Sequence, residues 1–309
     1  MRQQYIDILK GFTIIWVLWM HMDMPELIYP SVQMPIFFFL SGTFFRAKSS
    51  FVEQTINDGR RLLVPTGCFM SIAAILMTLR GDELWSWNII DVLQTCRNGS
   101  ITWFLIALFC LRALNYPFEK YHHKWWYLAL AIIVYPIGYI WKVKYPDVVV
   151  PIIPMVELFM FGIYYVIGYA MGKRVLQLSA PDGTRNIILG ILGGVILIFV
   201  HCMDWESGSL SHIPWLVYGF PYTLSCILLG LVISRLLEKV TLVAKPLAYV
   251  GKNSMVFYLT HLLVYLYIFK DLDWNPYLIF CIIVALEFPL IYVISRYLPW
   301  IVGIKKQYA

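Results

Sequence analysis

The sequence predicts an all-α integral membrane protein with about ten transmembrane helices and both termini in the cytoplasm, and three observations predict this. Its 309 residues are 60% hydrophobic and only 14% charged, whereas a soluble domain carries about 25% charged residues. Apolar runs of about 17 to 25 residues, each long enough to cross a bilayer as a helix, recur along the whole chain. The third observation is an uneven distribution of lysine and arginine along these runs.

The apolar runs define the predicted spans, and no soluble domain of useful size fits between them. The spans are about 6–22, 33–46, 62–79, 101–116, 125–140, 152–171, 186–203, 215–234, 254–270 and 276–295. The chain is therefore expected to form a single polytopic domain over residues 1–309. The segment 81–100 is too polar to span, and it is expected to lie in the interface as an amphipathic helix.

The basic residues orient these spans. With the N-terminus inside, 18 of the 24 Lys and Arg residues fall on the cytoplasmic side, 5 fall on the other side, and Lys10 lies within the first span. The positive-inside rule therefore places both termini in the cytoplasm. Topology alone explains the net charge of +6, so no nucleic-acid partner is expected.

The six cysteines are scattered and have no spacing typical of a metal site, so no metal is expected. They are interpreted as small apolar residues or isolated thiols. Cys96 and Cys202 fall in loops predicted to lie on the same face, so a disulfide between them is the open alternative.

Several ionisable residues lie well inside the predicted spans, where each costs about 2.5 to 3.5 kcal/mol unless it faces a protein interior or a cavity. They are Asp7, Lys10, His21, Glu157, His261 and Glu287.

Lys10 and His21 are three helical turns apart in the first span, about 16 Å along its axis and on nearly the same face. The predicted topology puts Lys10 in the cytoplasmic half and His21 near the outer rim. Each has a simpler interpretation: Lys10 extends to the cytoplasmic interface beside Asp7, and His21 contacts lipid headgroups.

A cytoplasmic loop after the second span carries Arg46, Lys48, Arg60 and Arg61. It is either the ordinary basic collar of a membrane loop or an anion-binding site, because arginine binds phosphate oxygens in a bidentate manner. A third stretch, "YVGKNSMVFYLTHLLVY", begins the ninth span. Asn253 or Ser254 is expected to cap that helix, and His261 lies about two turns deeper, either in a site or hydrogen-bonded for packing alone.

These stretches together resemble the acyltransferase-3 family of bacterial membrane proteins, which O-acylate sugars and polysaccharides. "YIDILKGFTIIWVLWMH" resembles the first-span pattern of the family at Asp7, Lys10, Gly11 and His21, with Lys10 in place of the commoner arginine. "FFFLSGTFF" is similar to an apolar-Ser-Gly-Phe element at Ser41 and Gly42. "GRRLLVP", "TWFLIALF" and "VGKNSMVFYLTH" resemble later elements on Arg60, Arg61, Pro65, Trp103, Ser254 and His261. The resemblance runs from about residue 3 to residue 295.

The resemblance implies a membrane O-acyltransferase of the bacterial inner membrane, with acyl-CoA, by default acetyl-CoA, as co-substrate and no permanently bound cofactor. The acceptor would be a hydroxyl of a cell-surface or exported sugar or polysaccharide. The donor phosphates would contact Arg60, Arg61 and Lys10, with Ser41, Ser254 and His261 as further donor-binding residues.

His21 would then act as a general base or as a covalent acyl acceptor, since an unperturbed imidazole with a pKa near 6.5 suits both roles. Its orienting partner would be Glu157 or Asp23, although Asp23 is also interpreted as a solvated loop residue. Trp103 would stack on a sugar or anchor the interface. The alternative from another class is a transporter or flippase of a glycan or lipid-linked sugar, which also needs charges inside the membrane.

Overall fold

Every regular element of the described chain is helical. The computed structural model describes residues 3–22, 24, 32–47, 50–81, 89–100, 102–145, 150, 152–178, 188, 190, 192–196 and 215–303. No strand occurs among these residues, which confirms the all-α prediction. Cys202 and the side chain of Cys96 lie outside the described part, so their disulfide stays a prediction.

Most of the helices overlap the predicted spans. They are α1 (Gln4–His21), α2 (Gln33–Thr43), α3 (Phe51–Arg80), α4 (Ile89–Ser100), α5 (Trp103–Asn115), α6 (Trp125–Lys144), α7 (Met155–Leu178), α9 (Trp215–Leu237), α10 (Thr241–Lys252), α11 (Ser254–Val264) and α12 (Pro276–Tyr297). Short 3₁₀ turns at Tyr116–Phe118 and Pro299–Val302 and a π-helix at Tyr265–Phe269 complete the elements. Of the predicted span 186–203, only a few helical positions are described.

Four helices are long and apolar enough to cross a membrane. They are α3, α7 (from Met155 to Gln177), α9 (from Phe220 to Leu237) and α12. Shorter apolar helices run over Trp103–Phe118, Trp125–Val134 and Ser254–Phe269. The membrane character is thus supported, whereas the number of ten spans and the side on which each terminus lies stay predictions.

The ends of two helices are defined by local sequence. Ser50 precedes α3 and its hydroxyl accepts a hydrogen bond from the Glu53 amide at 3.3 Å, the arrangement of a Ser-x-x-Glu capping box. The side chain of Asn275 accepts a bond from the Tyr277 amide at 2.9 Å, and Pro276 is the first residue of α12. No side-chain hydrogen bond caps the start of α11 at Asn253 or Ser254. Instead, the side-chain amide of Asn253 donates a hydrogen bond to the backbone carbonyl of Tyr249 near the end of α10.

Two pairs of helices approach so closely that only glycine fits between them. A Cβ placed on Gly11 of α1 would lie 2.0 Å from the Leu247 carbonyl oxygen of α10, and one on Gly251 would lie 1.7 Å from the Asp7 oxygen. Between α2 and α7, a Cβ on Gly42 would lie 2.0 Å from the Tyr165 oxygen. Small residues that let backbones approach are the usual way in which membrane helices associate.

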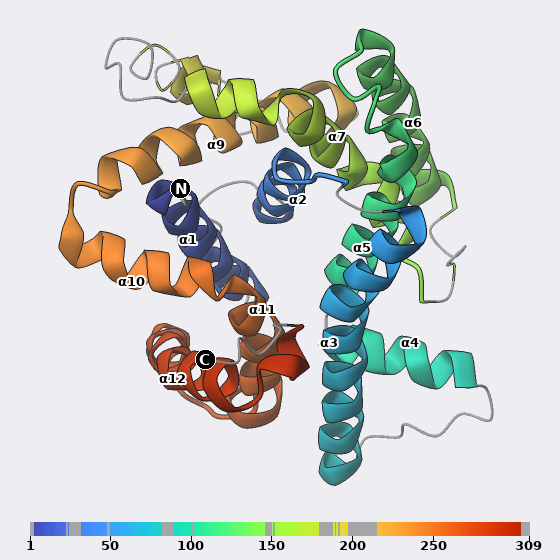
Figure 1. Ribbon diagram of the computed structural model, residues 1–309. Helices are drawn as coiled ribbons and strands as arrows, with labels where there is room; N and C mark the ends of the chain where they lie inside the picture. Colours follow the sequence, from blue (N-terminus) through green and yellow to red (C-terminus); the bar gives the residue numbers. More distant parts are fainter. Residues whose placement is uncertain are drawn as a thin grey trace.

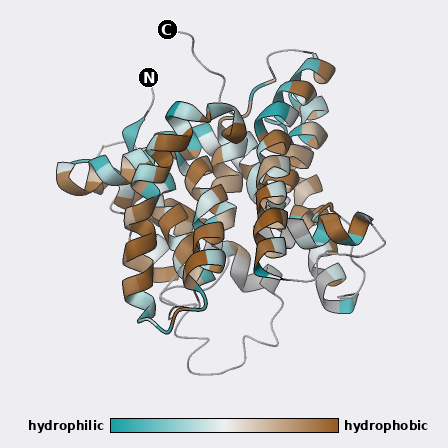
Figure 2. Cartoon of the chain, turned by 90° about the horizontal axis from the view of Figure 1, so that it is seen from below, coloured by the Kyte–Doolittle hydropathy of each residue, from teal (hydrophilic) through white to brown (hydrophobic). Residues whose placement is uncertain are grey.

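These two pairs form the interior of the bundle. In Figure 1, α1 and α2 lie centrally, with α10, α9, α7, α5 and α11 around them, and the packing of α1 against α10 and of α2 against α7 is extensive. Figure 2 shows hydrophobic residues along the middle of the helices.

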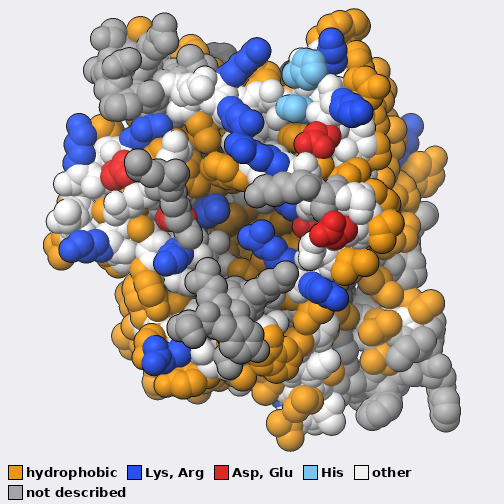
Figure 3. Space-filling view, viewed as in Figure 1, with side chains coloured by type: hydrophobic (Ala, Val, Ile, Leu, Met, Phe, Trp, Pro, Cys, Tyr) orange, Lys and Arg blue, Asp and Glu red, His pale blue; other side chains and the backbone are white. Residues whose placement is uncertain are grey.

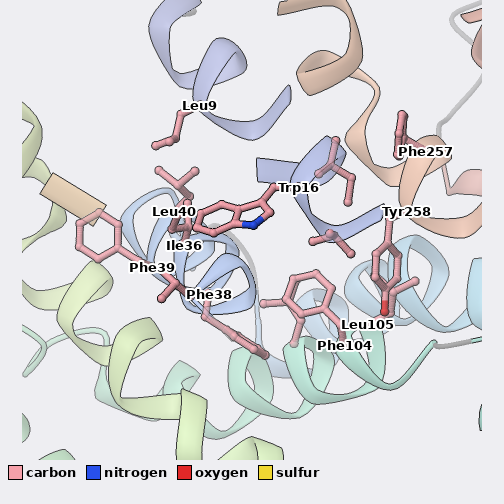
Figure 4. Close-up of a cluster of buried hydrophobic side chains, with 14 of the residues drawn as sticks. Leu9, Trp16, Ile36, Phe38, Phe39, Leu40, Phe104, Leu105, Phe257 and Tyr258 are labelled. Atoms are coloured by element: carbon pink, nitrogen blue, oxygen red, sulfur yellow. The ribbon is translucent and has the colours of Figure 1, made fainter. Parts of the chain in front are cut away.

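The core lies where α1, α2, α5 and α11 meet. Figure 4 shows Trp16 of α1 between side chains of α2 and α5, with Tyr258 of α11 beside Phe104. Phe38 packs edge-on against Phe104 with ring centroids 4.9 Å apart, and Phe104 packs in the same way against Tyr258 at 5.5 Å. This aromatic core holds the end of α1 in place beside α11.

Candidate active site

The two histidines that stand out in the sequence come together in space. His21 is the last residue of α1 and is half-buried, whereas His261 of α11 is fully buried. Their rings stack with centroids 5.7 Å apart and planes inclined by 28°. Two segments separated by 240 residues therefore place a pair of imidazoles at one point, which suits proton transfer or nucleophilic chemistry.

The orientation of the His261 ring is fixed by its own helix. Nδ1 lies 2.7 Å from the Phe257 carbonyl oxygen. Because a carbonyl can only accept a hydrogen bond, Nδ1 carries the proton. A neutral His261 then presents the lone pair of Nε2, which is buried and has no hydrogen-bond partner in the described part of the chain. The ring is thus held in one tautomer with an unused acceptor beside His21.

A common spacing explains why the histidines meet. Gly11 and Gly251 mark the closest approach of α1 and α10, and His21 and His261 each follow ten residues later. Ten helical residues advance the chain by about 15 Å. Although the second segment bends at Asn253, where α10 ends and α11 begins, both histidines reach the same depth from the same starting contact.

A buried carboxyl lies behind this pair. Glu287 of α12 is fully buried and its Oε2 accepts a hydrogen bond of 2.7 Å from the Thr260 hydroxyl. Thr260 precedes His261, and its hydroxyl also lies 2.8 Å from the Val256 carbonyl oxygen. Oε1 of Glu287 has no partner within the described residues. The bond ties α12 to the turn of α11 that carries His261.

Aromatic residues form one wall beside the histidines. Trp103, the first residue of α5, is half-buried and its ring lies 6.0 Å from Phe161 and 6.2 Å from Phe104. From Phe104 the contacts continue through Tyr258, whose ring centroid is 6.2 Å from that of His261. The wall connects Trp103 to the histidine pair through neighbouring rings.

Three further predicted residues lie next to the close helix contacts. Lys10 is half-buried and directly precedes Gly11. Ser41 is half-buried and directly precedes Gly42, and Ser254 is the half-buried first residue of α11. Lys10 and Ser41 therefore lie on helices whose positions are fixed by backbone contact, and Ser254 begins the helix that directly follows α10.

Arg60 and Arg61 lie on α3 with exposed side chains, whereas the two histidines lie on α1 and α11. They are part of a basic face. Figure 3 shows Lys and Arg side chains gathered around a hollow on the side viewed in Figure 1. Exposed cations of the described chain include Arg60 and Arg61 on α3, Lys173 on α7, Lys245 and Lys252 on α10, and Arg46 and Lys120 in connecting segments.

Neither of the two acids predicted to orient His21, Glu157 and Asp23, has a described contact with it. Glu157 is half-buried in the first turn of α7, and no hydrogen bond or ion pair links it to His21 in the part of the chain that is described. Asp23 lies outside the described residues. Glu287 was visible in the sequence as a carboxyl inside an apolar span, but its contact with Thr260 had no sequence signal, because Thr260 and Glu287 meet only through tertiary packing.

Comparison with known proteins agrees with this picture. The sequence model of one family, described as an acyltransferase domain, matches residues 3–302. No curated protein and no solved structure matches the chain. The match covers nearly all of α1 to α12, including both histidines, the glycines of the helix contacts and the arginines of α3. The chain therefore belongs to the acyltransferase-3 family of membrane acyltransferases.

Proposed function

We propose that this protein transfers an acyl group, acetyl by default, from acyl-CoA in the cytoplasm to a hydroxyl of a cell-surface or exported sugar or polysaccharide. The observation that carries the proposal is the stacking of half-buried His21 on buried His261, with rings 5.7 Å apart, in a chain of this family. Its setting would be the bacterial inner membrane, which the predicted spans would cross with both termini inside.

The donor would enter from the basic face. Its phosphates would contact Arg60 and Arg61, whose guanidinium groups bind phosphate oxygens in pairs, and Lys10 would lie deeper, on α1. From Lys10 to His21 the helix rises about 16 Å, a span that an extended pantetheine arm covers. Ser41 and Ser254 lie beside the helix contacts and would offer hydroxyl groups along this route.

The chemical step would take place at His21. In one version, its imidazole removes the proton of the acceptor hydroxyl while the oxygen attacks the thioester carbon; the carbon–sulfur bond breaks, and the proton passes to the leaving thiolate. In the other, His21 attacks the thioester carbon, and the carbon–sulfur bond breaks to release the CoA thiolate. The acceptor oxygen then takes the acyl group from His21, and the proton of the hydroxyl passes by way of the imidazole to the thiolate. Both versions yield the ester and free CoA.

The neighbours of His21 would position it and the acceptor. His261 would act as a positioning residue, since its ring is held by the Phe257 carbonyl and stacks on His21. Trp103 would offer an aromatic face to a sugar ring. Glu157 and Asp23 are retained as candidates to orient His21 when substrate is bound.

The experiment compares the O-acyl content of host glycans, by mass spectrometry, in cells that express the wild type, His21→Ala or His123→Ala. His123 is an exposed histidine in the turn before α6 and serves as the matched control. We expect O-acylation with the wild type and the control and none with His21→Ala, at equal protein levels in the membrane. Persistent acylation with His21→Ala would contradict the assignment, and glycans retained inside the cell without any change in acylation would favour the flippase.

A further inference from the structure

A buried ion pair joins α3 and α5 at a distance from the histidines. Nη2 of Arg112 lies 2.9 Å from Oδ1 of Asp58, and their side chains are only 16% and 8% exposed. Gln54 donates a hydrogen bond of 2.9 Å to the other oxygen of Asp58. Burying an ion pair gains little net stability, because desolvation offsets the attraction. The presence of this pair is better explained by something besides packing.

The charges around this pair do not balance. Arg61 follows Asp58 by three residues on the same helix, so the two side chains share a face. Arg61 interacts electrostatically with both Arg112 and Asp58. Two guanidinium groups therefore act on one carboxylate, so Asp58, Arg61 and Arg112 together carry one surplus positive charge. A further carboxylate, Glu119, acts on Tyr169.

Unused hydrogen-bond donors surround the same pair. Nε of Arg112 and the hydroxyls of Tyr165 and Tyr169 are buried, and none has a hydrogen-bond partner in the described part of the chain. The Phe45 ring brings these groups together: the guanidinium of Arg112 lies 4.8 Å from its centroid, and the rings of Tyr169 and Tyr165 lie at 5.2 Å and 6.1 Å. Tyr165 also interacts electrostatically with both Arg112 and Asp58.

The position of Tyr165 is not free to adjust. Its carbonyl oxygen is the atom that a Cβ on Gly42 would meet at 2.0 Å, so the contact of α2 with α7 fixes this part of α7. Tyr165 is fully buried and Tyr169 is only 8% exposed. Leaving such polar groups without partners costs about 1 to 3 kcal/mol each. A ligand that accepts hydrogen bonds and carries negative charge would satisfy all three.

We propose that Arg112, Arg61, Tyr165 and Tyr169 form a binding site for a phosphate group, in which Asp58 holds the Arg112 fork until the phosphate takes its place. Arginine and tyrosine donors suit the several acceptor oxygens of a phosphate. Asp58 and Arg112 line a shallow depression between α3 and α5, so a phosphate would reach Arg112 from this side by displacing the Asp58 carboxylate. Arg61, Tyr165 and Tyr169 do not line this depression. This site rests on the proposed function for its ligand, which would be a phosphate of the acyl-CoA donor.

The test measures binding of CoA and of inorganic pyrophosphate to the purified full-length protein by calorimetry, with thermal unfolding in parallel. Asp58→Asn removes the competing carboxylate, so we expect it to bind CoA about ten-fold more tightly while unfolding at a lower temperature. Asp58→Asn with Arg112→Gln removes both charges, leaves no unpaired buried ion, and should bind CoA at least ten-fold more weakly. Tyr165→Phe removes one hydroxyl without changing shape and should weaken binding several-fold.

A second ion pair supplies the matched control. Arg80 at the other end of α3 pairs with Asp271 and donates to the Leu266 carbonyl, so Arg80→Gln removes an arginine–aspartate pair from the same helix. We expect it to leave CoA affinity unchanged. If all the Asp58, Arg112 and Tyr165 variants change only the unfolding temperature, the pair is structural and the proposed site is wrong.

The probes separate this inference from the proposed function. If CoA binds the wild type and every variant equally, the phosphate site is refuted and the donor assignment stands. If CoA does not bind, whereas pyrophosphate or phosphatidylglycerol in nanodiscs binds with the expected order among the variants, the phosphate site stands and the donor assignment fails. Weaker binding of dephospho-CoA than of CoA, lost in the double variant, would place the 3′-phosphate at the site.

Discussion

The contact between Gly251 and α1 allows the positioning of the histidines to be tested without touching either of them. A Cβ on Gly251 would lie 1.7 Å from the Asp7 carbonyl oxygen. Real Cβ contacts are essentially never shorter than 3.0 Å, so Gly251→Ala must separate the backbones by at least the difference, 3.0 − 1.7 = 1.3 Å. Neither partner is a flexible side chain, so the helices themselves must move.

The shift is expected to reach the site because α11 follows α10 directly, with Asn253 as the corner. A displacement of about 1 Å at a reacting centre lowers the rate by about 100-fold. Overpacking of this kind also costs about 1 to 3 kcal/mol or more in stability. We therefore expect Gly251→Ala to lose most of its O-acylation activity and to unfold at a lower temperature.

The assay combines the O-acyl content of host glycans with thermal unfolding of the purified protein, and activity is compared at a temperature where both proteins are folded. Gly67→Ala is the matched control, since a Cβ on this α3 glycine meets nothing within 4 Å. That control should keep full activity and equal or greater stability, because alanine favours helix over glycine. Wild-type activity and stability in Gly251→Ala would refute the reasoning that the glycine contact sets the site.

Two smaller changes test other contacts. Thr260→Val removes the hydroxyl that donates to Glu287 and leaves a buried carboxyl unpartnered, so it should cost about 1 to 3 kcal/mol and reduce activity, whereas Thr260→Ser should retain both; equal unfolding temperatures for the two variants would count against this. Ser50→Ala removes the cap of α3 and should cost about 1 kcal/mol, measured by denaturant unfolding in detergent, with activity unchanged; a loss of activity without a loss of stability would contradict a purely capping role.

The sequence predicted most helices because lipid and a packed core select the same apolar runs. Its errors fall where polar residues continue a helix beyond the apolar part. The third span was predicted over 62–79, yet α3 begins at Phe51, because the Ser50–Glu53 capping box starts the helix well before its hydrophobic stretch. Helix α10 lies outside the ten predicted spans, since Lys245 and Pro246 interrupt the apolar pattern of this segment.

The candidate site was predicted residue by residue but not as an arrangement. His21 and His261 each stood out as costly groups in apolar spans, yet nothing local indicates that α1 and α11 meet. Arg112 was counted only among the cytoplasmic cations, because a cation near a helix end is usually solvated. Its partner Asp58 lies on another helix, and such pairing follows from packing rather than from local pattern.

The helix contacts explain why apolar and glycine positions matter as much as the polar ones in this fold. Gly11 and Gly251 bring α1 and α10 into backbone contact, and about 15 Å farther along each segment a histidine arrives at the same point. Gly42 does the same for α2 and α7, and thereby fixes Tyr165 beside Arg112. Backbone contacts adjust far less than side-chain contacts, so each contact fixes the relative position of the segments that carry these polar groups. The positions of the polar groups thus depend on glycines that do not contact them. A methyl group on Gly251 or Gly42 should therefore displace polar groups that it does not touch.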